Sequence, residues 1–133
     1  MNTVFLDTVG LVANWDTDDQ WHTAAEEAYR RLIEQRRTLV TTSFVLLECG
    51  NTSARRSFRG DVCVLRRALE LRSELILPSE DDWRRAWAAF ERGEAGQAGI
   101  VDQISFQVMR RLGITEAFTN DKHFQAAGFT VLF

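Results

Sequence analysis

The sequence contains few of the residues that mark several common protein classes. Its 133 residues include two cysteines and one proline. Cys49 and Cys63 have no partner cysteine or histidine at metal-ligand spacing, so we expect two reduced, buried thiols. A disulfide-stabilised secreted domain and a zinc-binding module are therefore disfavoured.

Long apolar runs are also missing. Charged residues interrupt every apolar stretch before it reaches the roughly 20 residues that a membrane-spanning helix needs. The first residues, "MNTVFLD", have neither the basic start nor the apolar region of a signal peptide. We expect one domain over residues 1–133, located in the cytoplasm and not associated with a membrane.

Positive charge is not in excess. The formal net charge is −3, which argues against a protein that coats nucleic acid simply by being basic. Lys122 is the only lysine among 16 cationic residues. Arginine binds phosphate well, although a GC-rich genome also produces such a composition. Arg55, Arg56 and Arg59 are candidates for contact with nucleic-acid phosphates, and a solvated or protein-binding surface is the alternative.

The spacing of apolar residues predicts strands that alternate with helices. Short β-prone runs predict five strands, at 3–6, 38–42, 75–78, 115–119 and 129–133. Amphipathic or well-capped stretches predict helices at about 21–36, 43–56, 61–72, 79–93, 100–113 and 120–127. Such alternation indicates a mainly parallel, twisted sheet of about five strands, with the direction of the last strand left open.

Two local features of these elements are also predicted. Ser43 is expected to cap the helix that follows the second strand. The segment 93–99, "GEAGQAG", is the only glycine-rich stretch and is expected to form a loop.

Acidic residues are expected to gather at one edge of this sheet. Parallel α/β sheets bind ligands beyond the carboxyl ends of their strands. Asp7 follows the first strand and Asp121 the fourth, while Glu48 and Asp102 lie near the starts of helices that begin at the same edge. Gathered carboxylates repel unless they are protonated or neutralised by a cation. Oxygen ligands favour Mg²⁺ or Mn²⁺, which can activate a water for attack on phosphorus.

Each acid also has a structural explanation. Asp7 and Asp121 precede helices that they could cap. Asp102 could be a first-turn acid that interacts with the helix dipole. Glu48 shares a helix face with the apolar Phe44, where a buried ion pair with an arginine is the alternative to a metal ligand.

The order of these acids resembles that of the PIN-domain nucleases, most closely the small toxins of the VapC type. The matching stretches are "VFLDTVGLVANWDTDDQWHTAAEEA", "TTSFVLLECGN" and "IVDQISFQVMRRLGITEAFTNDKHFQAAGF". Together they span nearly the whole chain. The segment "GEAGQAGIV" departs from the family, because relatives carry more polar and aromatic residues there.

This resemblance implies a three-layer α/β/α sandwich and an endoribonuclease that depends on Mg²⁺ or Mn²⁺. By family position, the metal-binding catalytic acids would be Asp7, Glu48, Asp102 and Asp121, and Thr8 would supply a hydroxyl at the site. The resemblance also implies a homodimer that a cognate antitoxin protein holds inactive.

Other enzyme classes fit less well. A phosphatase of the haloacid-dehalogenase type needs a second Asp two positions after the first, where this chain has Val9. A phosphorelay receiver needs an acceptor Asp after its third strand, where this chain has Pro78. Neither a dinucleotide-binding glycine motif nor a P-loop is present. The rival from a different class is a non-catalytic PIN-like module that binds RNA or a protein.

The histidines and tryptophans are expected to be structural. A metal-activated water needs no histidine base, so His22 and His123 are interpreted as packing or helix-face residues. Trp83 and Trp87 are four positions apart and share a helix face, which favours a core or interface over base stacking.

Overall fold

The computed structural model describes residues 2–133, so Met1 of the predicted 1–133 domain lies outside the described residues. In this range the elements are β1 (Thr3–Leu6), α1 (Thr8–Trp15), α2 (His22–Glu34), β2 (Thr38–Thr42), α3 (Ser43–Ser53), α4 (Arg59–Leu71), β3 (Leu75–Ile76), α5 (Glu80–Glu91), α6 (Glu94–Gln97), α7 (Ile100–Leu112), β4 (Glu116–Phe118), α8 (Lys122–Ala126) and β5 (Thr130–Val131).

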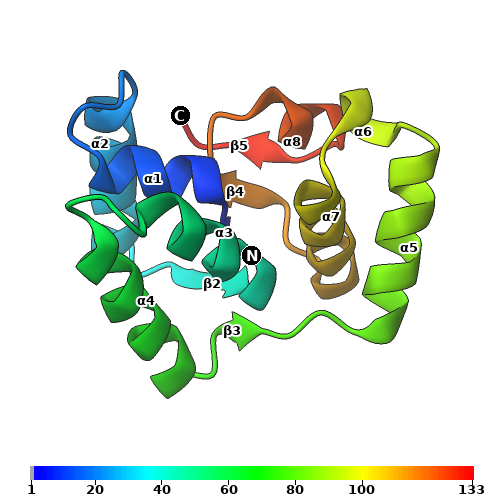
Figure 1. Cartoon of the computed structure of the whole chain (residues 1–133), viewed down its shortest axis with the longest axis horizontal. Coiled ribbons are helices and arrows are strands. Elements are labelled where there is room, and N and C mark those ends of the chain that lie inside the picture. The colour runs from blue at the N-terminus through cyan, green and yellow to red at the C-terminus, as the bar shows by residue number, and fades with distance from the viewer. Residues whose placement is uncertain (1) are drawn as a thin grey trace.

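The described strands form one five-stranded sheet in the order β3-β2-β1-β4-β5, and every pairing is parallel. Helices α1 to α4 lie on one side of this sheet and α5 and α7 on the other (Figure 1). The predicted α/β/α sandwich is therefore confirmed, and the last strand is parallel like the rest. The strand order reverses between β1 and β4, which is where such sheets form a ligand-binding crevice at the carboxyl edge.

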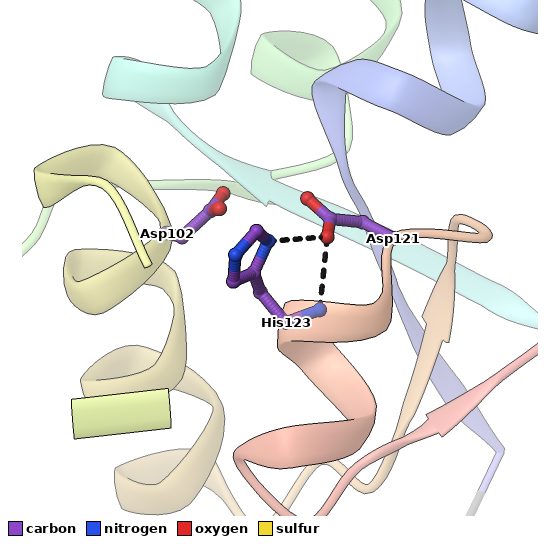
Figure 2. A group of neighbouring side chains, drawn as sticks. All are labelled: Asp102, Asp121 and His123. Carbon is purple, nitrogen blue, oxygen red and sulfur yellow. Dashed lines mark hydrogen bonds and ion pairs between the residues drawn. The ribbon is translucent and has the colours of Figure 1, made fainter. Parts of the chain in front are cut away.

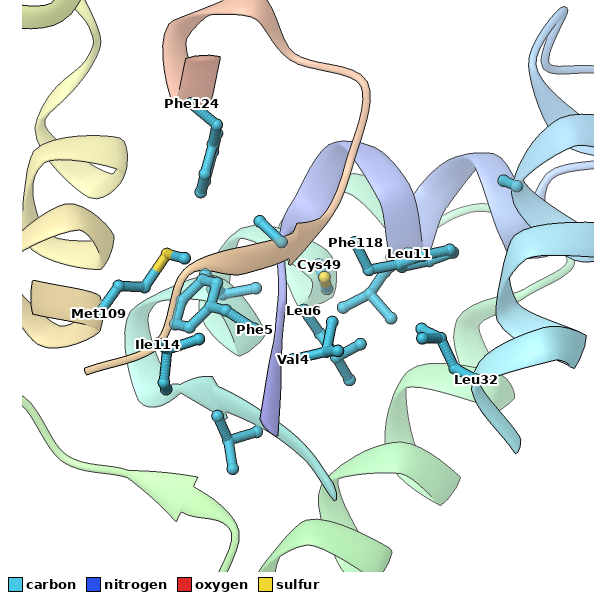
Figure 3. Packing of buried hydrophobic residues seen from close by; sticks show 14 of the residues in the cluster. Val4, Phe5, Leu6, Leu11, Leu32, Cys49, Met109, Ile114, Phe118 and Phe124 are labelled. Carbon is cyan, nitrogen blue, oxygen red and sulfur yellow. The ribbon is translucent and has the colours of Figure 1, made fainter. Parts of the chain in front are cut away.

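The central strand explains why the sheet holds together. Val4, Phe5 and Leu6 are all fully buried, as expected for a parallel strand that is covered on both faces. Phe118 of β4 and Leu11 of α1 belong to the same apolar cluster (Figure 3). Burial of this continuous apolar run places the end of β1, and thus Asp7, at the middle of the molecule.

Helix α1 approaches β4 unusually closely at Gly10. A Cβ atom at this position would lie 2.1 Å from the carbonyl oxygen of Phe118. Any side chain here would push α1 away from the sheet. Because Asp7 directly precedes α1, the close approach at Gly10 also determines how deeply Asp7 is buried.

Helix α3 differs from its prediction at both ends. It ends at Ser53, three residues before the expected end, and Thr42 is its cap in place of Ser43. The Thr42 backbone is still extended, and its hydroxyl accepts a hydrogen bond of 3.2 Å from the amide of Val45. The last residue of β2 therefore also begins the helix.

Several other predictions were wrong in detail. The edge strands β3 and β5 contain two residues each, and α4 begins and ends before the expected 61–72. The predicted loop 93–99 contains the short helix α6, in which Ala95 and Gly96 have left-handed backbone angles. Cys49 is buried as expected, but Cys63 is exposed, because it lies on the outer face of the amphipathic α4. Both cysteines are free. Within residues 2–133, no helix combines the length and apolar character needed to cross a membrane.

Candidate active site

Asp7 occupies the N-cap position of α1 but does not cap it. Its side chain makes no capping hydrogen bond. Instead, Oδ2 accepts a hydrogen bond of 2.9 Å from the hydroxyl of Thr119, at the end of β4. Asp7 is 1% exposed. Burial, followed by the negative charge of Asp102, raises its pKa to about 8, and the hydrogen bond from Thr119 opposes this rise.

Thr119 connects Asp7 to a second acid, Asp121. The amide of Asp121 donates a hydrogen bond of 3.1 Å to the Thr119 hydroxyl oxygen. Oδ1 of Asp121 caps α8 by accepting a 2.9 Å hydrogen bond from the amide of His123. The capping explanation is therefore correct for Asp121. Among the described residues, the hydrogen bonds to this carboxylate all end on Oδ1, so Oδ2 is available to a ligand.

Asp102 lies in the first turn of α7, on the other side of the same crevice. Burial raises its pKa to about 7, and the charges of Asp121 and Glu48 add to the rise. The neighbouring His123 opposes it. The negative charges of Asp121 and Glu48 therefore act on Asp102 in addition to any interaction with the helix dipole.

Glu48 is held by a hydroxyl and has no arginine partner within residues 2–133. Its Oε1 accepts a hydrogen bond of 2.6 Å from the hydroxyl of Thr8, the residue that the family resemblance implies at the site. The alternative of a buried Glu–Arg pair is therefore wrong. Cys49 lies next to Glu48 in α3. Burial and the nearby Asp7 charge raise the pKa of the Cys49 thiol to about 12, which keeps the thiol protonated and unreactive.

The donor set fits a divalent cation. The charges of Asp102, Asp121 and Glu48 all raise the pKa of Asp7. In the described part of the chain, no lysine or arginine forms an ion pair with any of these acids. Closely spaced carboxylates without a cationic side chain are the oxygen ligands that Mg²⁺ and Mn²⁺ prefer.

The tightest group of donors includes a histidine. Atoms of Asp102, Asp121 and His123 all lie within 4.8 Å of one another, and Asp7 and Glu48 lie outside this group. Figure 2 shows the imidazole of His123 between the two carboxylates. The sequence interpretation assigned His123 only a packing or helix-face role.

Thr119 and Cys49 were missed from the sequence. Thr119 carried a usable signal, because a polar residue at the end of a buried strand lies at the ligand-binding edge of a parallel sheet. Cys49 carried no such signal, since its burial close to Asp7 follows from how α3 packs against α1 and β2.

The three candidate RNA-binding arginines lie away from the acids. Arg56 forms an ion pair of 2.8 Å with Asp16 at the C-terminal end of α1, and Arg59 donates a hydrogen bond to a backbone carbonyl. Arg55 is exposed. Asp16 is nine residues beyond Asp7, so a helical rise of 1.5 Å per residue separates the backbones of these two residues by about 13 Å along α1.

The chain is similar to a known family over nearly all of its length. The PIN domain family matches residues 4–130. Among solved structures, VapC20 of Mycobacterium tuberculosis, described as a sarcin–ricin loop cleaving toxin, matches with a TM-score of 0.77 and 27% sequence identity over 96% of each chain. Comparison with curated proteins gives no significant match. The chain therefore belongs to the PIN-domain family, and its predicted resemblance to the VapC-type toxins is confirmed.

Proposed function

We propose that this chain is a metal-dependent endoribonuclease that hydrolyses phosphodiester bonds in RNA, with Asp7, Glu48, Asp102 and Asp121 as its catalytic acids. The crowding of negative charge on Asp7 is the observation that carries this proposal. Its pKa is about 8 because it is buried among three other acids, with no cationic partner among the described residues. A bound Mg²⁺ or Mn²⁺ would relieve this repulsion.

Asp7, Glu48, Asp102 and Asp121 would hold the cation. When bound, such an ion makes a water more acidic and stabilises negative charge on the scissile phosphate. The chain's own hydroxyls orient the acids: Thr119 holds one oxygen of Asp7, and Thr8 holds one oxygen of Glu48. Each acid therefore keeps its second oxygen for the cation or for a water.

The similarity to VapC20 supports RNA as the substrate, and an oligonucleotide of the sarcin–ricin loop is the first substrate to test. Arg55, Arg56 and Arg59 would contact phosphates at a distance from the cleaved bond. Their separation from the acids is compatible with a structured RNA that extends along α1 and α3.

We also propose that residues 1–133 act as one cytoplasmic nuclease domain that pairs with an antitoxin and with a second copy of itself. One apolar cluster extends from Val4 to Phe133, which supports a single domain. Trp83, Trp87 and Phe90 are adjacent on α5 and between 37% and 46% exposed, which supports contact with a partner. The molar mass of the purified protein in solution tests the dimer directly.

Cleavage by the purified protein tests the proposal. We expect cleavage with Mg²⁺ or Mn²⁺, none with EDTA, and a loss of about 100-fold or more in Asp7→Asn. Asp18→Asn is the matched control, because Asp18 is an exposed acid in the turn between α1 and α2. A wild-type protein that binds RNA but cuts it with neither ion would instead be the non-catalytic module considered above.

A further inference from the structure

A polar cavity lies between α5 and α7, at the end of α7 opposite to Asp102. The two helices pack side by side (Figure 1). They run antiparallel, because Asp82 in the first turn of α5 contacts Arg111 in the last turn of α7. Arg111 is nine residues beyond Asp102, so the helical rise separates the backbones of these two residues by about 13 Å. The cavity has a volume of about 350 Å³, and the residues that line it are Asp81, Asp82, Arg85, Gln107, Arg110 and Arg111.

Arg111 is held in place by a buried carboxylate. It donates three hydrogen bonds, of 2.7, 3.1 and 3.2 Å, to the two oxygens of Asp82. Asp82 is 3% exposed and is itself fixed by the capping box that it forms with Ser79 at the start of α5. The guanidinium group of Arg111 therefore has a fixed orientation at the cavity.

The other two arginines of the cavity are held by separate contacts. Nε of Arg85 lies 2.8 Å from Oδ2 of Asp81. The guanidinium group of Arg110 lies 5.5 Å from the centre of the Phe129 ring and donates a hydrogen bond of 3.1 Å to the carbonyl of Ala127. All three arginines are thus oriented before any ligand binds, which reduces the entropy lost on binding.

Each of these guanidinium groups keeps free donors. A guanidinium group has five N–H bonds. Within residues 2–133, Arg111 uses Nε and Nη2, Arg85 uses Nε, and Arg110 uses Nη2 in the contacts described above. Three arginines and two aspartates give the cavity wall a net charge of +1. The cavity therefore offers several N–H donors and a positive charge to an anion.

The lining indicates which kind of anion fits. The residues that line the cavity are all charged except Gln107, which carries an amide. The centre of a protein–protein interface is typically enriched in aromatic residues and poor in charged ones, so this lining does not favour a protein partner. A guanidinium group matches the oxygens of a phosphate group in shape and charge.

We propose that this cavity binds a backbone phosphate of the RNA substrate, at a second site apart from the four acids. This proposal rests on the function proposed above, because that function makes RNA the ligand. Arg55 lies between α3 and α4, on the other side of the sheet from α5 and α7 (Figure 1). The two surfaces can therefore be tested separately.

Two neighbouring arginines provide a matched test. Arg84 and Arg85 both form an ion pair with Asp81 and both have side chains that are 70% exposed, but only Arg85 lines the cavity. Arg84→Gln and Arg85→Gln each remove one positive charge from the same turn of α5. Arg111 is unsuitable, because its loss would leave the buried Asp82 unpaired. We would measure the Kd of each variant for a sarcin–ricin loop oligonucleotide with its flanking stem, in EDTA and at several salt concentrations.

We expect Arg85→Gln to bind this RNA about three- to tenfold more weakly at low salt, with the slope of log affinity against log salt reduced by about 0.7. Arg84→Gln should differ much less from the wild type. In cleavage assays with Mg²⁺ or Mn²⁺, Arg85→Gln should raise KM and leave kcat unchanged, because the cavity contacts a phosphate that does not react. Both variants should unfold at the temperature of the wild type.

Two results would overturn the phosphate site. Unchanged RNA affinity in Arg85→Gln would show that the cavity does not contact RNA and would favour an acidic group of a protein partner instead. Equal losses in Arg84→Gln and Arg85→Gln would mean that only general attraction by positive charge is involved. A wild type that binds RNA in EDTA but cuts it with neither ion would contradict the proposed nuclease function, while the two variants would still decide the phosphate site.

Discussion

The hydroxyl of Thr119 donates a 2.9 Å hydrogen bond to Oδ2 of Asp7 and accepts one of 3.1 Å from the amide of Asp121. It therefore joins the ends of β1 and β4 on the two sides of the crevice. One side chain orients two of the four acids, although it is not itself acidic.

Thr119→Val should impair both folding and cleavage. The change conserves shape but leaves the buried carboxylate of Asp7 and the amide of Asp121 without this partner, which costs about 1–3 kcal/mol in the free energy of unfolding. The pKa of Asp7 should rise further, because the hydrogen bond now lowers it. Thr115→Val, at an exposed position before β4, should change urea unfolding by less than about 0.5 kcal/mol. Equal effects of the two changes would contradict this role.

Glu48→Gln should separate catalysis from stability. Glutamine can still accept the hydrogen bond from Thr8 but adds no negative charge beside Asp7 and Asp102. We expect RNA cleavage to be abolished while the cation-free protein unfolds at the same or a slightly higher temperature. If Glu48→Gln cuts RNA at the wild-type rate, Glu48 is not a catalytic acid.

The cation-free protein should lose stability as the pH rises. The pKa of Asp7 is raised from 3.8 to about 8 and that of Asp102 to about 7. At any pH between the unfolded value of 3.8 and these raised values, the folded state binds more protons than the unfolded chain. The free energy of unfolding therefore decreases with increasing pH. Urea unfolding in EDTA from about pH 5 to about pH 8 should show this decrease. The decrease should be smaller in Asp7→Asn, and saturating Mn²⁺ should offset it. Equal slopes for wild type and variant would contradict the assignment to Asp7.

Gly10→Ala should destabilise the protein strongly. The added Cβ would meet the Phe118 carbonyl at 2.1 Å, so α1 must shift, at a cost of about 1–3 kcal/mol or more. Gly50→Ala, in α3, is the matched control, because an added Cβ there contacts nothing within 4 Å. It should stabilise the fold by about 0.5–1 kcal/mol, since alanine favours helix. Thermal unfolding distinguishes the two.

Arg55→Glu should weaken RNA binding without affecting the fold. Arg55 is exposed, whereas Arg56 also pairs with Asp16, so only Arg55 tests phosphate contact without a structural side effect. Loss of one phosphate contact should reduce the slope of log affinity against log salt by about 0.7. Arg31→Glu on α2 is the control, because Arg31 is likewise exposed and forms no ion pair among the described residues. Unchanged affinity and salt slope in Arg55→Glu would show that this surface does not contact RNA and is an antitoxin-binding or solvated surface instead.

Much of the fold could be predicted from local sequence patterns. The apolar run at Val4 to Leu6 is a local pattern that predicted a buried strand, and the periodic apolar residues of α2 and α7 predicted helices. The alternation of such strands and helices predicted the five-stranded parallel sheet. Element ends were less predictable. Thr42 caps α3 because β2 carries it to the sheet edge with an extended backbone, and residues 94–97 form a helical turn that packs against α8.

From the sequence alone, two acids follow strands and two lie near the starts of helices at one sheet edge, because in a parallel sheet the chain order decides which segments lie there. Only the tertiary structure decided the rest. The hydrogen bond between Thr119 and Asp7 spans 112 positions, and the imidazole of His123 lies between Asp102 and Asp121 only because α7 and α8 meet at the same edge. The raised pKa of Asp7 likewise depends on burial and on charges from distant segments, which no local pattern encodes.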